Sequence, residues 1–178
     1  MSAHLIDTNV MLAASAIHDA ASNLAEHASP RERALRELVY RELVRFQESD
    51  DRLVLDDENL IRDEYERNMP FNTRMGAQEY GLFVLQDKLD RDQVNWVFFD
   101  FIEGNGERIA VLSDELCVIV TDREDRKWIA AAMAHAGLYE SVSPITYGAE
   151  SDWYVIEDAL APYGIQFRRL LPREWYES

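Results

Sequence analysis

The sequence contains a single cysteine, Cys117, among its 178 residues. One cysteine excludes an intramolecular disulfide and any zinc site built from cysteines. Cys117 lies in the apolar run 116–120, so we expect a buried thiol without a chemical function. The cytoplasm is the compartment that we expect for such a chain.

Long apolar segments and common catalytic motifs are also missing. No apolar run approaches the roughly 20 residues that cross a bilayer, so we expect no membrane partner. Asp7 interrupts the only apolar stretch near the N-terminus, which argues against a signal peptide. The sequence contains no GxGxxG, GxxxxGK[ST], GxSxG or HExxH motif. No familiar motif of nucleotide binding or hydrolysis therefore competes with the acidic residues described below.

Basic residues are scarce, because 18 Lys and Arg stand against 34 Asp and Glu, a formal charge of -16. This balance argues against binding nucleic acid by a broad basic surface, since phosphate contacts supply most of that affinity. Two interpretations of the acids are left. They form a solvated surface, or some of them converge, repel one another and need divalent cations.

The chain has the organisation of one domain, residues 1–178, without repeats or linkers. Strands and helices alternate, which predicts an α/β fold of three layers, α/β/α, around a central parallel sheet. Strands are expected near 4–6, 52–55, 116–120, 144–147 and 165–170, and helices near 10–27, 30–49, 58–68, 74–102 (two helices), 126–136 and 153–161.

Three local patterns support these assignments. Ser29 and Pro30 are typical of a helix start, with Ser29 as the cap. The apolar residues of 94–102 have helical spacing, so we expect residues 70–113 to be a helical insertion or extension. The run 116–120 is rich in β-branched residues and predicts the central strand.

Carboxylates gather at four expected junctions between a strand and the following helix. Each has a simple explanation as a helix cap, and Thr8 or Asn9 could cap the first helix. Parallel β/α units, however, place all such junctions on one edge of the sheet, so the acids should converge there and suit magnesium or manganese. The acids are Asp7, then Asp56, Asp57 and Glu58 with Asp63 and Glu64, then Asp122, Glu124 and Asp125, and finally Glu150 and Asp152.

Four stretches resemble the PIN domain, a family of metal-dependent nucleases. Residues 5–10 resemble its opening strand with Asp-Thr-Asn, and residues 60–65 its helix with a second acid. Residues 122–132 resemble the third element, an acid opening a helix of small residues, and 148–153 the fourth. The resemblance implies a PIN-like fold and a hydrolase, an endoribonuclease that uses Mg²⁺ or Mn²⁺ to cleave phosphodiester bonds.

The resemblance also implies a set of site residues. Asp7 would be the central metal ligand and Asp125 its main partner, with Glu64 and Asp152 completing the catalytic site. Asp122 and Glu150 are the alternates. Substrate contacts would come from Thr8, Asn9, Arg123, Arg126 and Lys127, although helix capping or solvated charge explains these residues equally well.

The implied partner is nucleic acid, RNA before DNA. Because the chain is acidic, we expect weak, salt-sensitive substrate binding, or help from a basic protein partner, an inhibitor protein or a second copy in a homodimer. One alternative is a PIN-like interaction module that has lost catalysis. Another is a metal-dependent phosphatase on a similar α/β fold.

Overall fold

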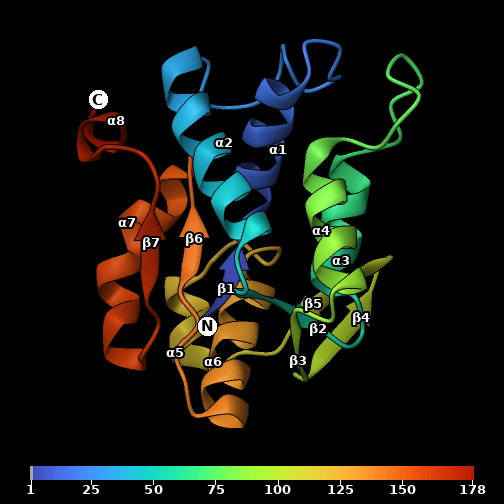
Figure 1. Ribbon diagram of the computed structural model, residues 1–178. Helices are drawn as coiled ribbons and strands as arrows, with labels where there is room; N and C mark the ends of the chain where they lie inside the picture. The colour runs from blue at the N-terminus through green and yellow to red at the C-terminus, as the bar shows by residue number, and fades with distance from the viewer. Residues whose placement is uncertain (1) are drawn as a thin grey trace.

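The centre of the molecule is a five-stranded parallel sheet with strand order β3-β2-β1-β6-β7 (Figure 1). The computed structural model describes residues 2–178. The sheet confirms the expected α/β class. Its strands are β1 (Ala3–Ile6), β2 (Arg52–Asp56), β3 (Val94–Val97), β6 (Ile145–Tyr147) and β7 (Phe167–Arg169).

Helices flank both faces of the sheet and give three layers. α6 packs against β1, β2 and β3, whereas α1, α2 and α4 pack against one another (Figure 1). Within residues 2–178, no helix combines the length and the apolarity that a bilayer crossing requires. The helices are α1 (Thr8–His18), α2 (Arg33–Glu48), α3 (Leu60–Asn68), α4 (Tyr80–Asp90), α5 (Asp114–Ile119), α6 (Arg126–Tyr139), α7 (Ser151–Leu160) and α8 (Arg173–Glu177), with a 3₁₀ turn at Ala161–Tyr163.

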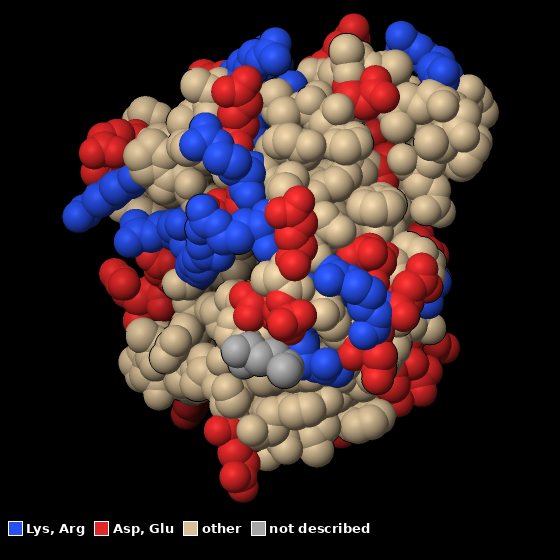
Figure 2. All heavy atoms as spheres, viewed as in Figure 1, with Lys and Arg blue, Asp and Glu red and all other residues tan. Residues whose placement is uncertain are grey.

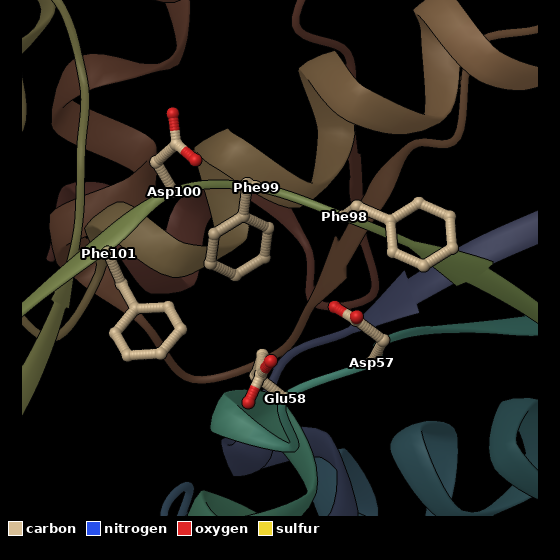
Figure 3. A pocket seen from close by; sticks show the side chains of 6 residues that line it. All are labelled: Asp57, Glu58, Phe98, Phe99, Asp100 and Phe101. Atoms are coloured by element: carbon tan, nitrogen blue, oxygen red, sulfur yellow. The ribbon is translucent and has the colours of Figure 1, made fainter.

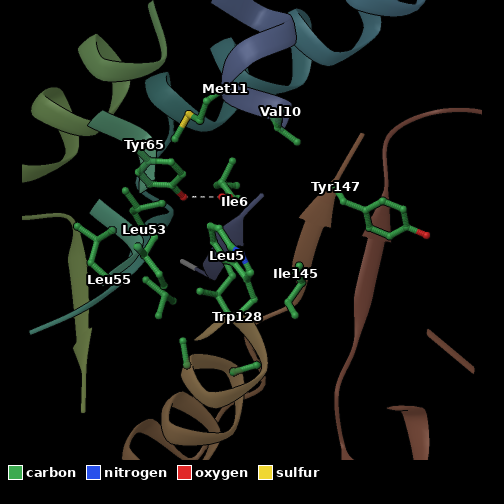
Figure 4. Packing of buried hydrophobic residues seen from close by; sticks show 14 of the residues in the cluster. Leu5, Ile6, Val10, Met11, Leu53, Leu55, Tyr65, Trp128, Ile145 and Tyr147 are labelled. Atoms are coloured by element: carbon green, nitrogen blue, oxygen red, sulfur yellow. Dashed lines mark hydrogen bonds between the residues drawn. The ribbon is translucent and has the colours of Figure 1, made fainter. Parts of the chain in front are cut away.

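The core holds the end of β1 in place. Leu5 is fully buried between neighbouring strands, and Trp128 of α6 covers it from one side (Figure 4). On α3, the buried Tyr65 hydroxyl donates a hydrogen bond of 2.5 Å to the carbonyl of Ile6. The last residue of β1 is therefore tied to α3 as well as to the sheet, which fixes the position of Asp7 directly after it.

The expected central strand at 116–120 is wrong, because this segment forms helix α5. Ser113 caps the helix by accepting a hydrogen bond from the backbone N–H of Leu116 (3.3 Å). Asp114 and Glu115 in the first turn also suit a helix N-terminus. A short apolar run does not distinguish a strand from a helix, so these caps decide it. Cys117 is consequently half-buried on a helix and is not enclosed in a strand.

The expected helix over 94–102 is also wrong. Val94 and Val97 belong to β3, the edge strand beside β2, and Phe101 starts the hairpin of β4 (Phe101–Gly104) and β5 (Glu107–Ala110). Its β-branched and aromatic residues favour extended chain. Segment 70–113 thus contains one helix and three strands and is not an all-helical insertion.

Two helix boundaries differ from expectation as well. α2 begins at Arg33 with Glu32 in the cap position, so Ser29 does not cap it. α1 ends at His18, well before residue 27. Turns occupy the residues between these two helices.

The packing of α4 on α1 should be intolerant of any side chain at Gly81. A Cβ there would lie 2.8 Å from Met11 Cβ and 2.5 Å from Met69 Sδ. We expect Gly81→Ala to lower the free energy of unfolding by about 1–3 kcal/mol, as overpacking does. Urea denaturation measures this. Gly137→Ala in α6 is the matched control, since nothing lies within 4 Å of its added Cβ and a gain of up to about 1 kcal/mol is expected. Equal effects of the two substitutions on the free energy of unfolding would contradict the close packing of Gly81 against Met11 and Met69.

Candidate functional site

The order of the strands points to one place on the sheet. From β1 the sheet continues through β2 and β3 on one side, and through β6 and β7 on the other. In open parallel sheets, ligands bind outside the carboxyl ends of the strands at such a switch point. β1 ends at Ile6 and β6 ends at Tyr147, so Asp7 and Glu150 follow the two strand ends that flank it.

Asp7 is a buried carboxylate held by two donors. The residue is 5% exposed. Oδ1 accepts a hydrogen bond from the indole N–H of Trp153 (3.2 Å), and Oδ2 accepts one from the backbone N–H of Asn9 (3.2 Å). Asp7 therefore caps α1 itself, and the expectation that Thr8 or Asn9 caps it is wrong.

The electrostatic environment of Asp7 opposes its negative charge. Burial, together with the carboxylates of Glu150 and Glu64, raises the pKa of Asp7 to about 8, although the two hydrogen bonds act to lower it. A cap that is only structural would gain from being charged. Asp7 is instead an acid whose ionised form lacks a compensating cation.

Among the neighbouring charges, Glu150 raises the pKa of Asp7 most. One oxygen accepts a hydrogen bond from the side-chain amide of Asn9 (2.8 Å), and the other accepts one from the backbone N–H of Asp152 (3.2 Å), capping α7. Burial raises the pKa of Glu150. Of the two candidates for the fourth acid, the structure thus places Glu150 beside Asp7, while Asp152 is exposed.

Asp125 joins the same group from the start of α6. Burial, together with the charges of Asp122, Glu150 and Glu64, raises the pKa of Asp125 to about 7, although Lys127 acts to lower it. Asp122, Asp125 and Asp152 line a neighbouring hollow of about 250 Å³. Asp122 and Asp152 are exposed to solvent at this hollow. Asp125 lines the hollow and also belongs to the buried group around Asp7.

Glu64 differs from the other acids of the group because it is paired with a cation. Lys127 Nζ lies 2.7 Å from Glu64 Oε1, and the Thr8 hydroxyl donates to Oε2. The Lys127 side chain is 7% exposed and its ammonium also contacts the Glu124 carbonyl (2.7 Å) and carboxylate (3.3 Å). Lys127 thus neutralises acids of the site, and three acceptors already occupy its ammonium.

The other expected substrate contacts are placed differently. Arg123 is exposed, and Arg126 donates through Nε to the carbonyl of Val120 (3.1 Å). Asn9 donates to Glu150 and Thr8 to Glu64, so both orient acids of the site. Direct contact of any of these residues with a substrate stays a prediction.

The carboxylate oxygens of the site are of the kind that bind hard divalent cations, but they do not point toward one common position. Across residues 2–178, no three His, Cys, Asp or Glu side chains stand close enough together to hold a metal ion. In the same described part of the chain, no salt bridge reaches Asp7, Asp125 or Glu150, and the pKa of each is raised. Repelling carboxylates that no ion pair neutralises are the ligands that Mg²⁺ and Mn²⁺ prefer. Binding would require these side chains to turn toward one point.

Two aromatic residues of the site could not be identified from the sequence. Trp153 is fully buried and donates to Asp7, and Tyr65 holds the end of β1. Both directly follow an expected acid, Asp152 and Glu64. That proximity was the available signal, but an aromatic residue beside an acid is equally typical of ordinary core packing.

The three acids directly after β2, Asp56, Asp57 and Glu58, do not join the group. Asp56 is buried and accepts hydrogen bonds of 2.9 Å from the backbone N–H groups of Leu60 and Ile61, so it caps α3. Neither Asp57 nor Glu58 is among the charges that act on Asp7. Together with residues 98–101 they line a separate hollow of about 430 Å³, where their carboxylates face the phenylalanine rings (Figure 3). The expected convergence is therefore wrong for Asp56, Asp57 and Glu58, whereas Glu64 of the same junction acts on Asp7.

Removing the charge of Asp7 should stabilise the metal-free protein in a pH-dependent way. Since its pKa is raised to about 8 from about 4 in an unfolded chain, the folded state binds an extra proton between these values, and stability falls as pH rises. We expect Asp7→Asn to raise the free energy of unfolding by on the order of 2 kcal/mol at pH 8, and by almost nothing near pH 4. Urea denaturation with a chelator at several pH values measures this.

The control for this experiment is Asp158→Asn, which removes one exposed carboxylate from α7. It should leave the pH dependence of stability unchanged. A parallel pH profile for wild type and Asp7→Asn would show that the burial of Asp7 does not oppose its charge.

Comparison with known proteins gives no relative for this chain. No family model, no curated protein and no solved structure matches it. The likeness to the PIN domain therefore stays a resemblance in four local stretches of the sequence.

Proposed function

We propose that this chain is a cytoplasmic, metal-dependent nuclease that hydrolyses phosphodiester bonds in RNA. The observation that carries the proposal is the group of acids at the switch point of the sheet. Asp7, Glu64, Asp125 and Glu150 come from four separate segments, and their charges act on one another. A stable fold gains nothing from such repulsion, whereas a site for divalent cations depends on it.

In the proposed site, Asp7 is the central ligand and Asp125 and Glu150 are its partners. A bound Mg²⁺ or Mn²⁺ would supply an acidified water and would offset charge on the phosphate. Trp153 and the Asn9 backbone fix the two oxygens of Asp7, and the Asn9 side chain fixes Glu150. These contacts orient the donors before a substrate arrives.

Protons are part of the proposed chemistry. With its pKa at about 8, Asp7 holds a proton at neutral pH unless a cation replaces it. The same applies in part to Asp125, whose pKa is about 7. Cation binding would therefore release protons and become tighter as the pH rises.

Cleavage of single-stranded RNA tests the proposal. We expect wild-type protein to cleave with Mn²⁺ and to lose activity with a chelator. Asp7→Asn should reduce the rate at least about 100-fold, because it removes the central anionic ligand. Asp158→Asn is the matched control and should cleave at the wild-type rate. Equal rates for wild type and Asp7→Asn would exclude a metal-dependent site at this position.

A second candidate function is an interaction module without catalysis. The ion pair of Lys127 with Glu64, 2.7 Å, favours it, because an internal cation already neutralises one of the acids. A module of this kind would bind no divalent cation at the site.

Calorimetric titration with Mn²⁺ separates the two functions and also identifies the fourth acid. For a nuclease, we expect Asp7→Asn to abolish Mn²⁺ binding. Glu150→Gln should weaken binding about 10–100-fold, because Asn9 hydrogen-bonds to both Glu150 and Asp7. Asp152→Asn, at an exposed position, should weaken binding much less. Binding that is equally strong in all four proteins would favour the module.

A further inference from the structure

Four arginines from two distant parts of the chain meet on one surface. Arg41 and Arg45 lie on α2, and Arg168 and Arg169 lie on β7, the edge strand of the sheet. They line a hollow of about 200 Å³ whose other lining residues are Leu38, Glu42 and Leu170. Figure 2 shows Lys and Arg side chains gathered over this part of α2 and β7. We refer to the four residues as the arginine patch.

The arginine patch has more positive charge than its acidic neighbours neutralise. Glu42 contacts both Arg45 (3.0 Å) and Arg168 (2.5 Å), and Glu157 lies 3.5 Å from Arg169. Among the described residues, no carboxylate lies within 4.0 Å of the Arg41 guanidinium. The four cations thus form ion pairs with only two carboxylates among the described residues, in a chain with 18 basic and 34 acidic residues.

Arg169 connects the arginine patch to the strand that leads to the proposed site. Arg169 is paired in register with Tyr147, the last residue of β6, and the backbone N–H of Leu170 donates to the Tyr147 carbonyl (3.0 Å). Glu150 follows Tyr147 by three residues. Arg169 therefore ends β7 and Glu150 follows β6, neighbouring strands that end on the same edge of the sheet, and the rest of the arginine patch extends from Arg169 over α2.

Aromatic rings continue the surface from Arg169. Its guanidinium lies 5.4 Å from the centre of the Tyr154 ring, which stacks on Tyr176 at 4.9 Å with an interplanar angle of 6°. The Tyr176 hydroxyl donates to the carbonyl of Gly148 (2.6 Å), on the segment that leads to Glu150. Proteins that bind single-stranded nucleic acid combine cations, which contact the phosphates, with aromatic rings, on which the bases stack.

We propose that the arginine patch binds the backbone of single-stranded RNA and brings it to the acids at the switch point. This inference rests on the proposed function, because it assigns the substrate surface of that site. An arginine guanidinium can donate two parallel hydrogen bonds to the oxygens of one phosphate. The patch lines a hollow between a helix and an edge strand, and this shape suits an extended RNA strand better than the flat surface of a membrane. The binding surface is thus local, although the chain as a whole is strongly acidic.

Binding without cleavage tests this inference separately from the proposed function. Fluorescence anisotropy would follow a labelled single strand of about 12 uridines, a length within the range of known binding sites, with a chelator present. We expect Arg41→Ala with Arg168→Ala to weaken binding about tenfold or more at about 50 mM salt. The slope of log affinity against log salt should fall by about 1.4, since each lost phosphate contact removes about 0.7.

The matched control is Arg31→Ala with Arg33→Ala, which removes the same charge from exposed positions outside the arginine patch. It should bind like wild type, and thermal melting should show that both double variants are folded. Equal binding by wild type and the Arg41/Arg168 variant would overturn the inference, even if the protein cleaves RNA. Patch-dependent binding to phosphatidylserine vesicles but not to the RNA would overturn it too. Patch-dependent RNA binding supports it, and a failure to cleave with Mn²⁺ would then count against the nuclease alone.

Discussion

The arrangement of the site depends on one buried carboxylate at the end of β1. Asp7 is fixed on both oxygens, by the indole of Trp153 from α7 and by the backbone of Asn9 at the start of α1. It is also desolvated, so its negative charge is opposed by burial and by Glu150. Asp7 lies where the paired parallel strands β1 and β6 end side by side. The fold therefore keeps an acid under electrostatic strain at the position where ligands of open sheets bind.

The second organising feature is the uneven distribution of charge. Acids gather at the switch point, where Lys127 is buried among them and pairs with Glu64. Arginines gather at the neighbouring edge strand, where Glu42 and Glu157 only partly neutralise them. The formal charge of -16 hides this separation, because it sums over the whole surface. Charges that act over a Debye length of about 8–10 Å are felt locally, so the arrangement matters more than the sum.

Sequence patterns predicted well those elements whose ends carry clear signals. β1, β2, β6 and α3 lie where the apolar runs and caps place them. The failures, 94–102 and 116–120, are short apolar segments that suit either a helix or a strand. For 116–120 the capping serine was decisive, and for 94–102 pairing with β2 was decisive. Local propensity is weaker than both contacts, which explains why it failed there.

The sequence by itself determined that Asp7 follows the first strand, that Asp125 opens a helix, and that acids outnumber basic residues. These are properties of neighbours along the chain. Only the tertiary structure decided that Glu150 lies beside Asp7, that Asp56 is a cap, and that Lys127 is buried among acids. It alone joined Arg41 to Arg168 on one surface. The physical reason is that these partners are remote in sequence, and only the packing of helices on the sheet brings their charges within interaction distance.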